Sequence, residues 1–255
     1  MLVLKLVAAV LIFCAGLAGG LLAIRLGKTS YRETATHLAN AFAGGVFLGA
    51  GLLHMLTDAR AKFDEFWPSL DFPLVALIAG FGFLIMLLLD KVLLRFGHHA
   101  SENFESGRIY PYVLMLALSV HSVIAGVALG LEDEYIVAAT IFIAILAHKA
   151  TASMALAISF VRGKLTAPRR TRLLLLFYLM TPLGLLIGST GAHFLEGNDE
   201  AMIEGIFDAT AAGTFLYIAV FNILTEEFQV AGNRFVLFAM TFIGFAFMAL
   251  LAVWA

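Results

Sequence analysis

Two histidines lie near the middle of two long apolar segments of this 255-residue chain. His121 occurs in LALSVHSVIAGVALG (residues 116–130), and His148 occurs in IAILAHKATASMALAIS (residues 143–159). Neutral imidazole is a good ligand for Zn²⁺ and its transition-metal neighbours, and a polar side chain in an apolar segment usually faces a partner or a water-filled path. A hydrogen-bonded core histidine is the alternative at each position. Two histidines at one depth favour a site for metal ions or protons.

The segments around these histidines have the composition of membrane-spanning helices. Hydrophobic residues make up 62% of the chain and charged residues 13%, whereas a soluble domain carries about 25% charged residues. A helix that crosses a bilayer needs roughly 20 apolar residues. We therefore expect an all-α membrane protein, with a single domain over residues 1–255 and eight transmembrane helices in one bundle. The expected spans are about 2–24, 35–57, 72–95, 110–131, 135–161, 171–191, 201–225 and 232–254.

The positions of the histidines within their spans predict that they meet. At 1.5 Å per residue, His121 and His148 both fall near the bilayer midplane. The fourth and fifth spans are joined only by EDEY (residues 132–135), so we expect antiparallel neighbours. Lys149 follows His148, and a buried lysine either loses its proton or finds an anion. It is also able to take the place of a second cation.

The loops differ in charge between the two sides of the predicted bundle. Most of the 16 Lys and Arg residues fall in one set of loops, whereas the opposite loops are acidic. Basic loops stay cytoplasmic, so both termini are expected outside, and the acidic side would concentrate cations near an entrance. Ordinary solvated loops are the alternative. The net charge of −2 gives no indication of nucleic-acid binding, and one cysteine excludes an internal disulfide.

Two further pairs of polar residues lie at the ends of spans. His54 and Asp58 are four residues apart and share a helix face, which suggests an entrance site or interfacial solvation. Glu226 and Glu227 close the seventh span and would receive an ion on the cytoplasmic side, although acidic helix ends are also common. Asp208 is interpreted as structural. His193, near the outer surface, is likewise interpreted as structural, and the pair His98 and His99 in a loop is a weak candidate for loose metal binding.

Several segments together resemble the ZIP (Zrt/Irt-like) family of divalent-metal transporters. They are NAFAGGVFLGAGLLHMLTDA (40–59), ALSVHSVIAGVALGL (117–131), LAHKATASMALAIS (146–159), LMTPLGLLIGSTG (179–191) and AAGTFLYIAVFNILTEEF (211–228). The resemblance implies eight spans, termini outside, and a metal site lined by His121 and His148. Ser122 replaces an asparagine and Lys149 an aspartate of the binuclear members. That pattern is similar to the mononuclear branches with HSVFEG and HK motifs, and Ser122 is expected as a weak auxiliary ligand.

The chain departs from the family pattern at several positions. Ala125 stands where the fourth helix normally has a glutamate, four residues after the histidine. Asn222 replaces a glutamate frequent in the seventh helix, and Thr57 and Thr225 replace prolines. Without a carboxylate at position 125 the predicted site is neutral, or positive with Lys149, so a dication would bind weakly.

The resemblance and the histidines together predict a transporter that moves divalent transition metals into the cytosol through a midplane site between spans 4 and 5. Zn²⁺ is the first candidate, and Fe²⁺, Cd²⁺ and Mn²⁺ are others; no further cofactor is expected. The chain contains no GxxxxGK[ST] segment, so we do not expect ATP hydrolysis. The first alternative is a transport-deficient metal sensor or interaction protein. The second is an intramembrane metal-dependent hydrolase, which the sequence disfavours because it offers only two central histidines where such an enzyme needs three protein ligands. The expected location is the plasma membrane or the bacterial inner membrane.

Glycines spaced as GxxxG allow helices to approach closely. Gly45 and Gly49 form one such pair in the second span, and Gly126 and Gly130 form another in the fourth. These faces permit a homodimer, and the other expected partners are the metal ion and the lipid bilayer.

Overall fold

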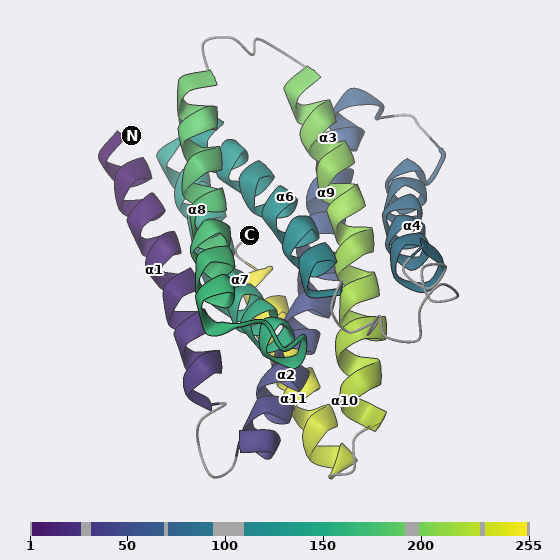
Figure 1. The fold of residues 1–255 in the computed structure, drawn as a ribbon. Coiled ribbons are helices and arrows are strands. Elements are labelled where there is room, and N and C mark those ends of the chain that lie inside the picture. The colour runs from purple at the N-terminus through teal and green to yellow at the C-terminus, as the bar shows by residue number, and fades with distance from the viewer. Residues whose placement is uncertain are drawn as a thin grey trace.

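A computed structural model describes residues 2–26, 32–68, 71–93, 110–191, 199–229 and 233–253. Its elements are helical (Figure 1). They are α1 (Leu2–Leu26), α2 (Arg32–Gly49), η1 (Ala50–Met55), α3 (Leu56–Phe66), α4 (Leu74–Leu87), η2 (Leu88–Leu93), α6 (Tyr110–Leu131), α7 (Tyr135–Arg162), α8 (Ala167–Gly191), α9 (Asp199–Tyr217), η5 (Ile218–Leu224), α10 (Thr225–Gln229) and α11 (Arg234–Leu251). The elements labelled η are π-helical segments that continue the neighbouring α-helices.

Within the described residues, 8 helices are long and apolar enough to cross a membrane, which confirms the predicted number. The second differs in length: it continues through α3 to Phe66, whereas residues 59–66 were expected to connect two spans. Buried Ala59 and Phe63 hold one face of α3 against the protein. On its exposed face Arg60 and Asp64 form an ion pair of 3.1 Å at the i, i+4 spacing that supports a helix.

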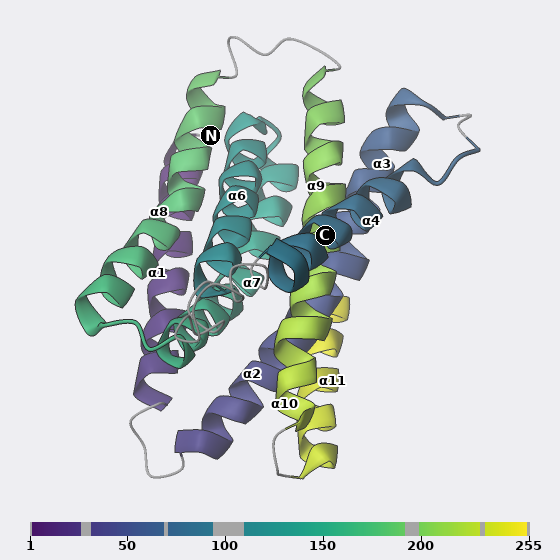
Figure 2. The same ribbon diagram turned by 45° about the vertical axis from the view of Figure 1, so that its right-hand side comes forward.

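The helices pack in two groups, which lie side by side in Figure 2. In the first group α6 packs along α8, and α1 packs along α7 and α8. In the second, α2 packs along α11, and α4 and α3 pack along α9. Contacts between the groups are made chiefly by α2 with α7 and by α6 with α9. The boundary between the groups is therefore where polar side chains from both can meet.

Glycine allows the helices within each group to touch backbone to backbone. A Cβ atom added to Gly126 of α6 would collide with the carbonyl oxygen of Thr181 in α8, and one added to Gly184 of α8 would collide with that of Val123. In the second group, Gly45 of α2 has the same relation to the carbonyl of Thr241 in α11. The predicted close approach is thus made within the chain. The homodimer stays a prediction.

A threonine follows each of the π-helical segments η1 and η5 within two residues of its end. Thr57 donates its hydroxyl to the carbonyls of Leu53 and His54, at 2.9 and 2.7 Å. Thr225 donates to the carbonyl of Val220 at 2.6 Å. A π turn shifts the backbone hydrogen-bond register, and these hydroxyls supply additional donors for its carbonyls. The sequence singled out Thr57 and Thr225, but it gave no indication of the π segments.

Candidate functional site

A cavity of about 490 Å³ lies between the two helix groups. It extends from mid-helix histidines to residues at the helix ends, so it has a deep end and a mouth. Its wall on the first group comes from α6 and α7, and its wall on the second from η1, α3 and α9. The lining residues are His54, Met55, Asp58, Ala61, Lys62, His121, Ala125, Ala128, Leu131, Glu132, Val137, Thr140, Ile141, Ala144, Ile145, His148, Glu204 and Asp208.

Three imidazole rings gather at the deep end of the cavity. The ring centroids of His121 and His148 are 5.8 Å apart, and those of His54 and His148 are 6.2 Å apart. His121 packs edge-on against Phe215 at 5.0 Å, and both of its ring nitrogens lack a hydrogen-bond partner among the described residues. A buried polar atom without a partner is uncommon. Free imidazole nitrogens beside a cavity are available to a ligand.

The described side chains do not form a complete coordination shell in this conformation. Among the described residues, no group of three or more His, Cys, Asp or Glu side chains is arranged to hold a metal ion. Ala125, four residues after His121 on α6, lines the cavity with a methyl group. The wall formed by α6 and α7 therefore presents imidazoles at the deep end of the cavity. The carboxylate on this wall is that of Glu132, which directly follows α6.

Lys149 does not line this cavity and is 2% exposed. Its Nζ donates to Ser122 Oγ at 3.0 Å, to Thr181 Oγ1 at 3.1 Å and to the carbonyl of Phe177 at 3.4 Å. It also lies 3.9 Å from the centroid of the Phe177 ring. All of these partners are neutral. Ser122 Oγ accepts from Lys149 Nζ and does not line this cavity, and its role as an auxiliary ligand stays a prediction.

The mouth of the cavity is lined by charged residues of α3 and α9. His54 Nδ1 lies 2.9 Å from Asp58 Oδ2. Lys62 forms ion pairs with Glu204 at 2.9 Å and with Asp208 at 2.8 Å. Asp208, which we had interpreted as structural, thus lies on the cavity wall. Sequence reasoning missed Lys62 and Glu204 because each resembles an ordinary charge near a helix end.

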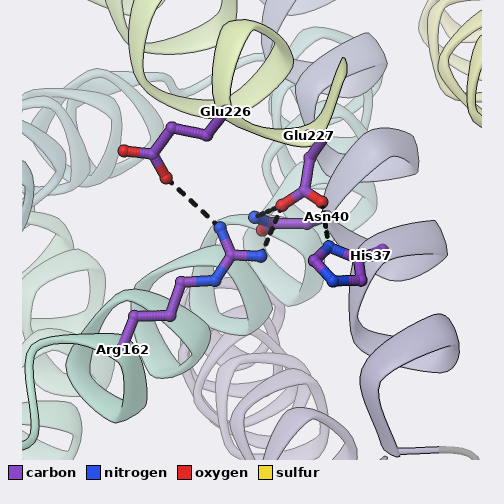
Figure 3. Close-up of polar contacts among 5 residues, drawn as sticks. All are labelled: His37, Asn40, Arg162, Glu226 and Glu227. Carbon is purple, nitrogen blue, oxygen red and sulfur yellow. Dashed lines mark hydrogen bonds and ion pairs between the residues drawn. The ribbon is translucent and has the colours of Figure 1, made fainter. Parts of the chain in front are cut away.

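At the opposite end of the helices, Glu226 and Glu227 differ sharply in environment (Figure 3). The side chain of Glu226 is 54% exposed and lies 3.3 Å from Arg162, whereas that of Glu227 is 0% exposed. Glu227 contacts Arg162 Nη2 at 2.5 Å, Asn40 Nδ2 at 2.6 Å and His37 Nδ1 at 2.5 Å (Figure 3).

Sequence reasoning did not identify His37, Asn40 or Arg162 as site residues. His37 and Asn40 are three residues apart on α2, and therefore on one face of the helix. This three-residue spacing was the one feature of the sequence that could have pointed to His37 and Asn40 as site residues. The weak candidates His98 and His99, and His193, which is interpreted as structural, lie outside the described residues.

The fold and the cavity define a polytopic α-helical membrane protein with an imidazole-lined cavity between two helix groups. The chain belongs to the ZIP zinc transporter family, whose profile matches residues 2–108 and 97–252. This confirms the resemblance seen in the sequence, and the family is one of transporters rather than enzymes. The assignment to a mononuclear branch stays a prediction.

Similarity to individual curated proteins extends over most of the chain. Zinc transporter ZIP2 of Mus musculus is 29% identical, with 89% of this chain and 88% of that protein aligned. Zinc transporter ZIP1 of Homo sapiens is 28% identical over 84% of this chain and 77% of its own length. Zinc transporter ZIP1 of Takifugu rubripes is 28% identical, with 88% and 87% aligned.

Proposed function

We propose that the protein carries divalent transition-metal ions, Zn²⁺ first among them, across a membrane through the cavity between its helix groups. The observation that carries this proposal is the meeting of His54, His121 and His148 at the deep end of that cavity. Imidazole suits Zn²⁺ and its neighbours in the transition series, and the similar curated proteins are named zinc transporters. Fe²⁺, Cd²⁺ and Mn²⁺ are further candidates.

The charge of the helix ends supports a direction of transport. The end opposite the cavity mouth carries Arg25, Lys91, Arg162 and, at the start of α8, Arg169 and Arg170. Basic helix ends stay cytoplasmic. The mouth then faces outward and the cargo moves toward the cytosol. The membrane is the plasma membrane or a bacterial inner membrane, with both termini outside.

The chemistry of the path follows from its lining. Asp58, Glu204 and Asp208 attract a cation to the mouth, where Lys62 keeps the net charge from becoming too negative. His54 and Asp58 pass the ion to His121 and His148, which bind it through nitrogen. Weak binding at imidazoles without a carboxylate favours release. Glu226 and Glu227 lie at the exit, so an ion reaches them only after the helix groups rearrange.

The test is metal uptake into proteoliposomes that contain the purified protein. Wild-type protein should take up Zn²⁺ saturably, and a His121→Ala, His148→Ala double variant should lose that uptake. Ser153→Ala is the matched control, because Ser153 is buried on α7 facing Gly16 of α1, away from the cavity. Loss of uptake in both variants, or in neither, would contradict the assignment of the histidines.

A transport-deficient metal sensor is the second candidate, and Ala125 is the observation that favours it. A cavity wall without the family's carboxylate binds a dication less strongly. This candidate predicts Zn²⁺ binding to the purified protein with no uptake in the same proteoliposomes. An intramembrane hydrolase needs three protein ligands and a water on its metal, and no such ligand group occurs among the described residues.

A further inference from the structure

The carboxylate of Glu227 is enclosed by three donors from two different helices. Its side chain is 0% exposed, and it contacts His37 and Asn40 of α2 and Arg162 of α7. Burying a carboxylate is costly unless a cation and hydrogen-bond donors compensate. These contacts therefore hold Glu227 in place and leave none of its surface open to solvent.

Arg162 links the two helix groups at this end of the molecule. Glu226 and Glu227 lie on α10, which packs on η5, α2 and α11 of the second group, and Arg162 reaches both glutamates from α7 of the first (Figure 3). Its guanidinium contacts Glu227 at 2.5 Å through Nη2 and Glu226 at 3.3 Å through Nη1. A separation of the two groups at this end must break both ion pairs.

The same helix carries His148 and Arg162. They are 14 residues apart, which is about 21 Å along α7 at 1.5 Å per residue. Fourteen residues are also close to four turns of 3.6 residues, so both side chains lie near the same face of the helix. A movement of α7 as a rigid rod therefore displaces the cavity wall and the contacts of Arg162 together.

We propose that Arg162 acts as a latch: its ion pairs with Glu226 and Glu227 keep the two helix groups together at the exit end of the transport path. By the same contacts it occupies Glu227, the carboxylate that the departing metal ion binds next. This proposal rests on the proposed function. Arginine keeps its charge at all accessible pH values, so a dication and the guanidinium cannot occupy the same Glu227 oxygen. When α7 withdraws Arg162, Glu227 and the His37 imidazole form a receiving site for the ion. The Asn40 amide oxygen joins them once that amide, whose Nδ2 faces Glu227 in this structure, has rotated. These ligand types suit Zn²⁺ and its neighbours.

The latch is tested by measuring how readily a buried thiol at this end reacts. Ser159 lies three residues before Arg162 on α7 and is buried, and Cys14 is the one cysteine of the chain. A Cys14→Ala, Ser159→Cys protein in nanodiscs should react slowly with a charged maleimide. Adding Arg162→Gln should raise the labelling rate about tenfold, equivalent to about 1.4 kcal/mol in the opening equilibrium. Arg162→Lys, which keeps the charge, should remain closer to the parent.

Ser153→Cys is the matched reporter, because Ser153 is also buried on α7, at 0% exposed against 7% for Ser159, but faces α1 within the first group. Its labelling should not change with Arg162→Gln. An unchanged rate at position 159, or equal increases at both reporters, would overturn the proposal, the second because it indicates general loosening.

Exchanging the charges provides an independent test. Arg162→Glu or Glu227→Arg alone should expose the thiol at position 159, because each places like charges together, and the two changes combined should restore its protection. If the combined variant is folded, as judged by size-exclusion chromatography, but its thiol at position 159 stays exposed, the proposed role of Arg162 is contradicted. Absence of Zn²⁺ uptake by the wild-type protein would refute the proposed function, and with it the role of Glu227 toward the ion, but not the closure by Arg162, since thiol labelling requires no transport.

Discussion

Restoring a carboxylate with Ala125→Glu should strengthen metal binding and slow release. Position 125 lines the cavity one helical turn from His121, where side chains four residues apart have Cβ atoms roughly 5–6 Å apart. A unit charge pair at 4 Å gains about 4 kcal/mol at an effective dielectric constant of 20, and a dication gains about twice that. Dehydration of the carboxylate and the ion removes several kcal/mol. We expect a net gain of about 1.5–3 kcal/mol, or roughly 10–100-fold in Kd.

Isothermal titration of the purified protein with Zn²⁺ measures this gain, and uptake into proteoliposomes measures its cost. The variant should show a lower Kd together with a lower maximal uptake rate, since a more tightly held ion leaves more slowly. Ala125→Gln, which has nearly the same shape without the charge, is the control and should remain within a few-fold of wild type. An unchanged Kd in a folded Ala125→Glu protein would refute the placement of the bound ion beside His121.

Two further predictions concern packing and the mouth. Gly184→Ala should lower the free energy of unfolding by about 1–3 kcal/mol, because the new Cβ collides with the carbonyl of Val123. Thermal unfolding in detergent measures this loss of stability. Gly80→Ala is the control and should show no loss, because its Cβ meets nothing within 4 Å. Lys62→Gln should lower the KM for Zn²⁺ uptake by roughly threefold at low ionic strength, since Glu204 and Asp208 lose their neutralising partner. That effect should vanish at about 1 M salt, where the Debye length is about 3 Å; a salt-independent KM would exclude this mouth as the entrance.

The helices were predictable because their signal is local. An apolar run of sufficient length gives a span wherever it occurs, and the glycines at positions 126 and 184 mark where backbones touch. The extension of the second span to Phe66 was missed because α3 carries many charges. Its helicity depends on i, i+4 pairs and on the burial of Ala59 and Phe63 rather than on hydrophobicity.

The candidate site was only partly predictable, for a physical reason. His121 and His148 stand out because an imidazole is conspicuous among apolar residues, and their meeting follows from a short connection between antiparallel helices. The partners of Glu227 are far away in sequence: His37 is separated from it by 190 residues and Arg162 by 65. Such contacts depend on how the two helix groups face each other, which no local pattern encodes. Arg162 therefore resembled any other basic residue at a helix end.

The neutral wall beside His121 and His148 has a consequence for energetics. A carboxylate at position 125 would cancel part of the charge of a bound dication, but the methyl group of Ala125 leaves that charge uncompensated by this wall. Under the proposed function, the step that carries the bound ion across the membrane voltage then moves two elementary charges, whereas a carboxylate moving with the ion would lower the charge moved in that step and leave the total per cycle unchanged. Moving one elementary charge through 100 mV changes the free energy by about 2.3 kcal/mol, so a dication gains about 4.6 kcal/mol. An interior-negative voltage would itself drive such uptake, without a coupled ion.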